Sequence, residues 1–295
     1  MNSLLIVEPG FQTTVQDLGR FGYAHLGVSA SGAADALALR AANLLVGNAE
    51  NAPALEMTLT GVTVQFEKAA VIALTGSEFG AGLPLWKAVD VSAGALVRCG
   101  AALSGARGYL AVRGGIDAAM VLGSASVHLA SGVGGRALKA GDVLRVGDGA
   151  VRRARSGALS SSLYEGPLRV TAGPQAAWFG QELFDSVYQV GEASNRMGIR
   201  LVGTAIPSPP GRMVTEGVAL GAIQIPPDGQ PIILFVEHQT TGGYPKPANV
   251  ISADLCRVGQ LRPRDTVRFE PVTLAKAREL RRAQEEWIYS ILSME

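Results

Sequence analysis

The sequence predicts a mainly β fold built from two packed units, and three observations support this. The chain has 295 residues, which is long for a single hydrophobic core and short for three ordinary domains. Its 37 glycines and 15 prolines interrupt the chain repeatedly. Between them lie short runs rich in valine, isoleucine and leucine instead of long stretches with helical period. Closely spaced strands with few helices are typical of barrels and sandwiches.

The first half is predicted to hold several short strands and one helix. The helix follows Ser31, which we assign as its N-cap; Asp35 lies in its first turn and Gly47 ends it. The polar segment 12–20 is predicted as a loop of the kind that often carries function. Its side chains either line a functional cleft or, as we favour, include a surface pair of Asp17 with Arg20. Strands are expected at 4–7, 62–66, 70–74, 109–112 and 143–146.

A small, polar and basic stretch at 151–162 is predicted as a linker. We therefore expect a first domain at 1–150, a second at 163–272 and a C-terminal amphipathic helix at 273–295, where alanine, arginine, glutamate and leucine recur with helical spacing. The second domain is expected to contain a short helix at 175–184 and strands at 168–171, 187–190, 222–225, 232–236 and 267–269.

Composition excludes several classes of protein. The 26 Lys and Arg residues nearly balance 25 Asp and Glu residues, so no global field draws the chain to nucleic acid or an anionic membrane. Only 17% of residues are charged, which leaves a thinly charged surface suited to a protein partner. Cys99 and Cys256 lack the spacing of a zinc site and the density of a disulfide scaffold, which fits a reducing cytoplasm. The N-terminus has no signal peptide pattern, and no apolar run is long enough to span a bilayer.

Several catalytic signatures are missing. The three histidines, His25, His128 and His238, lack the spacing of zinc enzymes, so no metal site is expected. The sequence has no P-loop for a nucleotide and no Gly-x-Ser-x-Gly elbow. The segment 132–137 matches a loose dinucleotide fingerprint, but the residues after it are too few for the required helix, so we reject it.

The richest polar cluster is EHQTTGGYPK at 237–246, directly after a predicted apolar strand. Its hydroxyls, its amide and the backbone of its glycine pair suit a carboxylate, phosphate or polarised amide oxygen, with a lysine nearby. Two interpretations are about equally open: a ligand site, or a polar hairpin in which the glycines make a tight turn. His238 is the one histidine placed for proton transfer.

Two further segments carry candidate ligand groups. Asn195 and Arg196 lie in a predicted turn, where an amide and a guanidinium together can grip a carboxylate, although a surface turn with a solvated arginine is the simpler explanation. Gln224 lies within an apolar strand, so its buried amide needs a partner. That partner is either a ligand or, more commonly, neighbouring backbone.

Together these segments resemble the biotin-dependent carboxyltransferase family, also called the second allophanate-hydrolase-type subunit. The likeness covers nearly the whole chain. It is carried by eight blocks in order: TTVQDLGR (13–20), AANLLVGN (41–48), ALTG (73–76), YLAV (109–112), GGID (114–117), SNRMG (194–198), GAIQ (221–224) and QTTGGYP (239–245). Two blocks depart from the family pattern. Glu237 and His238 stand where the family commonly has an acid and an arginine, so a role that needs a permanent cation does not carry over to position 238; ASGAAD (30–35) stands for a PSGAMD block.

The resemblance implies two cyclophilin-like β-barrel domains with a few short helices and a C-terminal helix. Stand-alone members resemble the C subunit of the bacterial 5-oxoprolinase, which with other subunits opens 5-oxoproline to glutamate using ATP. The expected partners are a companion first-subunit-type protein and a lactam-utilisation subunit. ATP is then handled by a partner and no cofactor is bound by this chain, which is expected to be inactive alone.

The resemblance leaves two alternatives open. One is a carboxyltransferase subunit acting on urea or allophanate-type amides, which requires a biotinylated partner because this chain has no biotinyl-lysine pattern. The other is a regulatory antagonist of a kinase inhibitor, which needs only a partner surface.

We expect one concave site to bind a small cyclic amide between the two halves. Catalytic roles are assigned to His238, Gln239 and Thr241. Substrate-binding roles are assigned to Asn195, Arg196, Gln224, Thr240, Gly242, Gly243 and Tyr244.

Overall fold

A computed structural model describes residues 2–148, 164–208 and 213–293. The linker predicted at 151–162 lies outside the described residues. Contacts divide the chain into two compact units, neither of which is one continuous stretch. Unit 1 gathers residues 1–20, 31–160 and 286–295, and unit 2 gathers residues 21–30 and 161–285. The boundaries of the three predicted domains stay a prediction.

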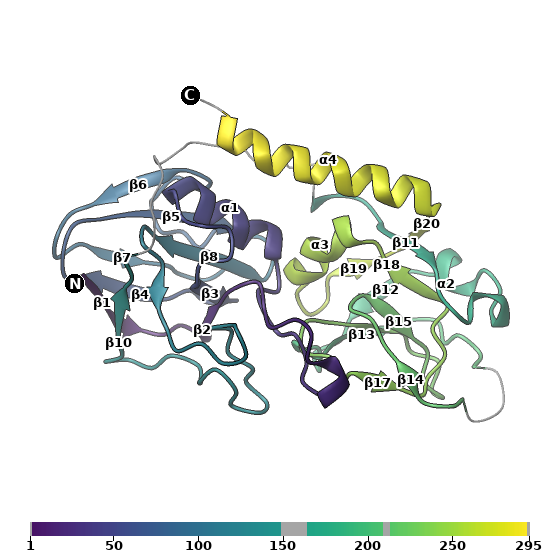
Figure 1. Cartoon of the computed structure of the whole chain (residues 1–295). Coiled ribbons are helices and arrows are strands. Elements are labelled where there is room, and N and C mark those ends of the chain that lie inside the picture. The colour runs from purple at the N-terminus through teal and green to yellow at the C-terminus, as the bar shows by residue number, and fades with distance from the viewer. Residues whose placement is uncertain (1, 149–163, 209–212, 294–295) are drawn as a thin grey trace. The chain divides into compact units, whose positions relative to one another are not determined.

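Unit 1 contains two five-stranded sheets, in the orders β7-β4-β1-β10-β9 and β2-β3-β8-β5-β6 (Figure 1). Neighbouring strands in both are antiparallel. The strands are β1 Ser3–Glu8, β2 Gln12–Gln16, β3 Ala54–Thr58, β4 Thr63–Phe66, β5 Ala70–Gly76, β6 Ala88–Val91, β7 Leu96–Arg98, β8 Arg107–Val112, β9 Ile116–Asp117 and β10 Val143–Val146.

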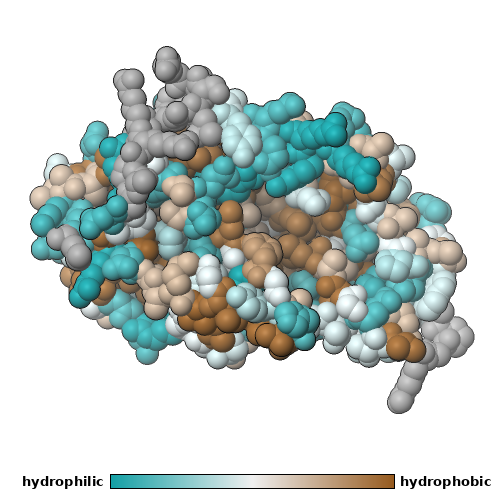
Figure 2. Space-filling model, viewed as in Figure 1, coloured by the Kyte–Doolittle hydropathy of each residue, from teal (hydrophilic) through white to brown (hydrophobic). Residues whose placement is uncertain are grey.

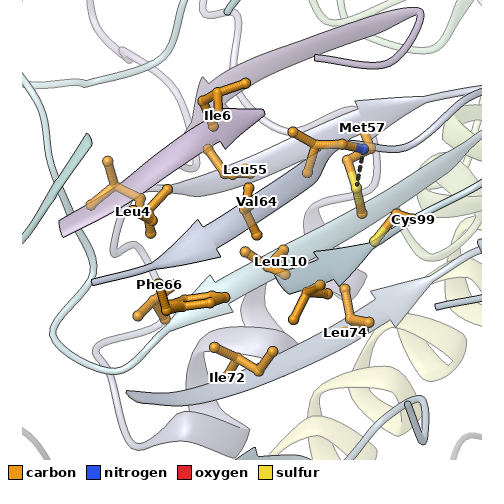
Figure 3. Packing of buried hydrophobic residues seen from close by; sticks show 14 of the residues in the cluster. Leu4, Ile6, Leu55, Met57, Val64, Phe66, Ile72, Leu74, Cys99 and Leu110 are labelled. Carbon is orange, nitrogen blue, oxygen red and sulfur yellow. Dashed lines mark hydrogen bonds between the residues drawn. The ribbon is translucent and has the colours of Figure 1, made fainter. Parts of the chain in front are cut away.

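The core of unit 1 is formed by apolar side chains from both sheets (Figure 3). Leu4 and Ile6 alternate with more exposed residues along β1, as the two-residue period of a strand requires. They join fully buried Leu55 of β3 and Leu110 of β8 in the same cluster. Because such side chains come from runs that the sequence marks as apolar, five of the ten described strands of this unit were predicted: β1, β4, β5, β8 and β10.

Helix α1 (Ala36–Val46) begins one residue after Asp35, whose carboxylate accepts a 2.9 Å hydrogen bond from Ala38 N. The N-cap is therefore Asp35, and the prediction of Ser31 is wrong. Ser31 has a positive φ of 56°, and its hydroxyl donates a hydrogen bond to Val127 O instead of capping the helix. Gly47 ends the helix in the left-handed conformation, as predicted. The helix packs on β5 and β8 (Figure 1).

The segment predicted as a polar loop at 12–20 begins with strand β2, which pairs with β3. The loop prediction is wrong for 12–16, where hydrogen bonds within the fold bind several of the polar groups, whereas 17–20 lies outside any helix or strand. Gln16 is fully buried, and its side-chain Nε2 donates hydrogen bonds to Thr14 Oγ1 and Val127 O. Asp17 and Arg20 are also buried and are not a surface pair. Asp17 accepts hydrogen bonds from the backbone and hydroxyls of residues 124–126, and Arg20 donates to Ser126 O.

Unit 2 is organised around an eight-stranded sheet in the order β19-β12-β13-β16-β15-β18-β11-β20, with a separate two-stranded ribbon, β14-β17. Only the β11–β20 pair of the large sheet is parallel. The strands are β11 Leu168–Ala172, β12 Tyr188–Val190, β13 Gly198–Val202, β14 Glu216–Gly217, β15 Ala222–Gln224, β16 Ile232–Leu234, β17 Thr241–Gly242, β18 Ala248–Val250, β19 Thr266–Val267 and β20 Phe269–Pro271.

The remaining helices are short except for the last. The predicted helix at 175–184 is two separate turns, because Phe179 and Gly180 interrupt it. Helix α4 (Leu274–Ser293) lies within the predicted C-terminal range 273–295, and its face in Figure 2 is mostly hydrophilic. No helix among the described residues is long and apolar enough to cross a membrane. The helical segments are η1 Ala24–Leu26, η3 Ala176–Trp178, α2 Glu182–Asp185, η4 Ser252–Asp254, α3 Leu255–Gln260 and α4 Leu274–Ser293. The predicted mainly β fold with a C-terminal helix is confirmed.

Both cysteines are buried, and neither forms a disulfide. Burial raises the pKa of the Cys99 thiol to about 12, so the reactive thiolate is scarce at neutral pH. We expect Cys99 in the native protein to resist iodoacetamide at neutral pH and to react once urea unfolds the chain. Peptide mass spectrometry with and without urea measures this, and rapid labelling of native Cys99 would contradict the packing described for it.

Candidate functional site

The polar cluster at 237–246 follows β16 and contains strand β17. Thr241 and Gly242 pair with Gly217 and Glu216 of β14, which lies well before them in the chain. The segment is therefore not a hairpin closed on itself. Its position is fixed by a distant ribbon partner, which a sequence pattern could not indicate.

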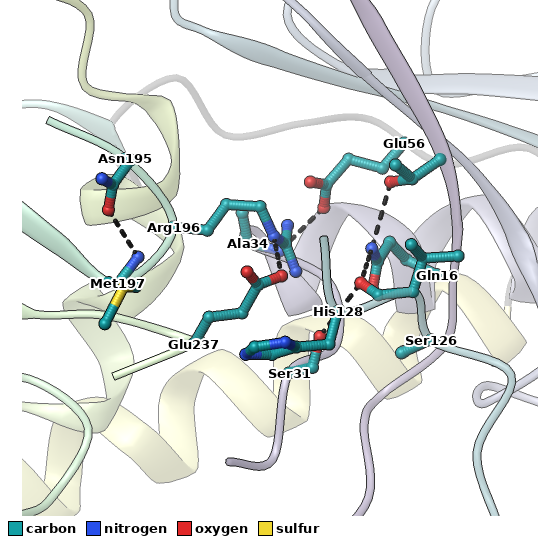
Figure 4. A network of polar contacts seen from close by, with 12 residues as sticks. Gln16, Ser31, Ala34, Glu56, Ser126, His128, Asn195, Arg196, Met197 and Glu237 are labelled. Atoms are coloured by element: carbon teal, nitrogen blue, oxygen red, sulfur yellow. Dashed lines mark hydrogen bonds and ion pairs between the residues drawn. The ribbon is translucent and has the colours of Figure 1, made fainter. Parts of the chain in front are cut away.

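Arg196 anchors the beginning of this cluster. Its Nε donates to the Glu237 carboxylate (Figure 4). In addition, Glu237 N donates to Arg196 O at 2.8 Å. Both side chains are buried, with side-chain exposures of 6% and 3%. A buried ion pair of this kind is costly to break from one side, because the remaining buried charge loses its oppositely charged neighbour. The predicted carboxylate-binding arginine thus also has a structural role.

Asn195 lies beside this pair in sequence but points its amide oxygen at the backbone. The Asn195 Oδ1 atom accepts a 2.8 Å hydrogen bond from Met197 N, which closes a local turn (Figure 4). The Asn195 amide nitrogen is the group left for the predicted substrate contact, and that role stays a prediction.

Three predicted residues converge in unit 2. Gln239 Nε2 donates to Gln224 Oε1 at 3.4 Å. Gly242 lies against both side chains, since a Cβ atom built on it would be 2.5 Å from Gln224 Nε2 and 3.5 Å from Gln239 Nε2. Gln224 is buried within β15, whereas Gln239 is exposed. The glutamine pair thus links the interior of the sheet to an accessible surface.

The other predicted residues of the cluster differ in accessibility. Thr241 and Tyr244 are exposed, while Thr240 and Gly243 are half-buried. Thr240 also accepts a hydrogen bond from Val218 N through its backbone oxygen. The exposed side chains are the ones that a ligand can reach without rearrangement.

The last residue of the cluster, Lys246, was not among the predicted site residues. Lys246 is 2% exposed, and its Nζ contacts Glu216 Oε1 at 2.7 Å and Tyr244 O at 3.2 Å. Gln175 binds both ends of this pair, donating to Glu216 and accepting from Lys246 N. The hydrogen bond from Lys246 lowers the pKa of the Glu216 carboxyl. The lysine is visible in the sequence motif, but nothing in the sequence points to Gln175 or Glu216.

His238 is half-buried, and its Nδ1 lies 2.6 Å from Gln239 O. Burial lowers the pKa of the imidazole below its ordinary value, because the charged form is poorly solvated there. The ring is therefore neutral at pH 7 and gains a proton only as the pH falls. This suits a proton acceptor and does not suit a permanent cation.

We expect the NMR titration of the His238 ring to have its midpoint below pH 6.5, the ordinary value. The signal is assigned by its loss in His238→Asn. A midpoint above 6.5 would contradict the lowering of the His238 pKa by burial.

Unit 1 contributes a second buried polar network that sequence reasoning missed. The carboxylate of Glu56 accepts hydrogen bonds from Tyr109 Oη at 2.7 Å and Ala34 N at 2.8 Å. Burial raises the pKa of Tyr109 most, and the nearby carboxylates of Glu56 and Asp35 raise it further. The hydroxyl therefore stays protonated and donates a hydrogen bond. These contacts hold the start of α1 against the sheet.

Within the described ranges no cluster of histidine, cysteine and carboxylate side chains could hold a metal ion. The absence of a metal site and of a bound cofactor stays a prediction.

The model of the carboxyltransferase domain, subdomain A and B, matches residues 26–271. The chain belongs to this family. Among curated relatives, the C subunit of 5-oxoprolinase from Haemophilus influenzae is 38% identical, with 97% of this chain and 96% of the relative covered. The protein of the same name from Escherichia coli is 39% identical, with 96% of each chain covered. Urea amidolyase of Saccharomyces cerevisiae is 34% identical over 97% of this chain but only 17% of its own length.

Solved structures of the family have the same fold. The urea amidolyase of K. lactis superposes with a TM-score of 0.88 at 31% identity, over 98% of this chain and 20% of that protein. The structure of TTHA0988 superposes with a TM-score of 0.82 at 35% identity, over 92% of this chain. This chain spans about half of that protein, 55% of its length. In several family members this fold is thus one part of a longer polypeptide.

Proposed function

We propose that this chain is the C subunit of a multi-subunit, ATP-dependent 5-oxoprolinase that opens 5-oxoproline to glutamate. The observation that carries the proposal is the match to two proteins named as this subunit, over nearly the full length of this chain and of each relative. The urea amidolyases match this chain only as a small part of much longer proteins. The full-length correspondence therefore favours the oxoprolinase subunit.

In this proposal the exposed Thr241 hydroxyl, the Gln239 amide and the backbone of Gly242 and Gly243 orient a small cyclic amide. Donors held in place before the reaction stabilise negative charge on an amide oxygen as it develops. Neutral His238 accepts or returns a proton during opening of the lactam ring. The arrangement supplies binding and positioning rather than a nucleophile.

The substrate carboxylate needs a cation, and in this proposal the cation is the guanidinium of Arg196. A carboxylate bound by Asn195 and Arg196 has to share the guanidinium with Glu237. Because a guanidinium has five donors in a planar fork, sharing between two carboxylates is chemically reasonable. Tyr244, which is exposed, is proposed to cover the ring of the substrate.

The partners carry the remaining chemistry. We propose that this chain assembles in the cytoplasm with a companion first-subunit-type protein and a lactam-utilisation subunit. One of these partners binds and hydrolyses ATP, and this chain binds no cofactor. The chain alone is then inactive. The names of the relatives, which describe a subunit, support this dependence.

The test is a substrate comparison with the reconstituted set of subunits. We expect ATP-dependent formation of glutamate from 5-oxoproline and no ATP consumption driven by urea. Mass spectrometry of the products and a phosphate-release assay measure both. Turnover of urea without turnover of 5-oxoproline would contradict the proposal.

Carboxyl transfer to urea or an allophanate-type amide is the second candidate, favoured by the close structural match to the K. lactis enzyme. It requires biotin on a partner. Labelled avidin applied to the co-purified complex detects such a partner, and a biotinylated protein in stoichiometric amount would favour this candidate over 5-oxoproline.

A further inference from the structure

Gln224 carries a buried hydrogen-bond donor that is not used within the part of the chain that the structure describes. The residue is 2% exposed, and its Nε2 atom has no hydrogen-bond partner. Leaving a buried donor unpaired costs stability, so such a group in a folded protein calls for an explanation. A bound ligand oxygen would supply the missing acceptor.

The orientation of this amide is fixed by its neighbour. Gln239 Nε2 donates to Gln224 Oε1, so the oxygen end of Gln224 faces a donor. Rotating the Gln224 amide by half a turn would place two NH₂ groups against each other. With the Gln239 amide in this orientation, the NH₂ end of Gln224 is the unpaired donor.

Gly242 lies directly against this unpaired donor. A Cβ atom at position 242 would lie 2.5 Å from Gln224 Nε2 and 3.1 Å from Val218 Cγ1, so even a methyl group would displace the amide. The backbone does not demand glycine here, since Gly242 lies in strand β17 and has no positive φ. The close approach to Gln224 is thus what requires a residue without a side chain.

We propose that the buried Gln224 amide, left unpaired beside Gly242 and oriented by Gln239, is a subsite for the carbonyl oxygen of a small amide. A neutral NH₂ donor matches a neutral carbonyl oxygen, whereas the nearby cation of Lys246 is held by Glu216. The inference rests on the proposed function for the identity of the amide, 5-oxoproline, but not for the subsite itself.

The experiment follows the side-chain NH₂ signals of Gln224 in the assembled complex, with ¹⁵N-glutamine in this chain. The signals are assigned by their loss in Gln224→Met. We expect them to shift when 5-oxoproline is added. A shift with urea alone would support the subsite and contradict the proposed substrate. The absence of a shift with either amide would overturn the subsite, and turnover of 5-oxoproline by the same sample would leave the proposed function intact.

A matched pair of glycine variants and a stability measurement complete the test. Gly242→Ala should weaken binding of the amide about tenfold, as the loss of one hydrogen bond does. Gly217→Ala is the control, because a Cβ atom there meets nothing within 4 Å.

Gln224→Met should weaken binding equally and leave the melting temperature unchanged or higher. A lower melting temperature with unchanged binding would assign Gln224 a purely structural role and overturn the proposal.

Discussion

Replacing Thr241 with valine is expected to lower the rate of glutamate formation by the assembled complex by on the order of a hundredfold. This is the loss typical of removing one well-placed donor to a developing oxyanion. Thr241 is exposed in β17, and valine has nearly the same shape and suits a strand, so the fold should be retained. Initial rates with saturating 5-oxoproline and ATP measure the effect.

Thr266→Val provides the matched control, because Thr266 is also an exposed threonine in a two-residue strand of unit 2. It should leave the rate unchanged. Equal activity of the Thr241 and Thr266 variants in complexes of equal composition would remove Thr241 from the site.

Arg196→Ala is expected to lower the free energy of unfolding by about 3–5 kcal/mol, because it leaves the buried Glu237 carboxylate without its ion-pair partner. Urea unfolding monitored by tryptophan fluorescence and circular dichroism measures this. Loss of activity in this variant would therefore not by itself show that Arg196 binds substrate.

The double variant Arg196→Met/Glu237→Leu separates the two roles of the arginine. Replacing both members of a buried pair with apolar side chains is often neutral, so much of the stability should return. If it does return, and 5-oxoproline no longer binds, the carboxylate-binding role gains support. A single Arg196→Ala variant as stable as the wild type would contradict the structural role assigned to the pair.

The sequence predicted the elements whose cause is local. Apolar runs marked most of the long strands, such as β5 and β8, because alternating or continuous burial follows directly from side-chain type. Gly47 marked the end of α1, and the alanine, arginine and leucine spacing marked α4. Strand β2 was missed because Thr13, Thr14 and Gln16 are polar. Their burial is offset by two local hydrogen bonds, Thr13 to Pro9 and Gln16 to Thr14, and by a long-range one from Gln16 to Val127 O.

In the candidate site, too, local features could be predicted from the sequence and long-range contacts could not. The motif at 237–246 could be selected from composition, and the glutamine at 224 from its apolar surroundings. Their convergence could not be predicted, since it depends on the short ribbon that pairs β14 with β17. The same holds for the contact of Arg196 with Glu237, 41 residues apart, and for Lys246 with Glu216.

The most direct measurement is ATP-dependent release of glutamate from 5-oxoproline by the two partner proteins, with this chain present and with it omitted. We predict glutamate release only when all the proteins are mixed, with none from this chain alone. Equal release with and without this chain would contradict its assignment as a required component of the enzyme.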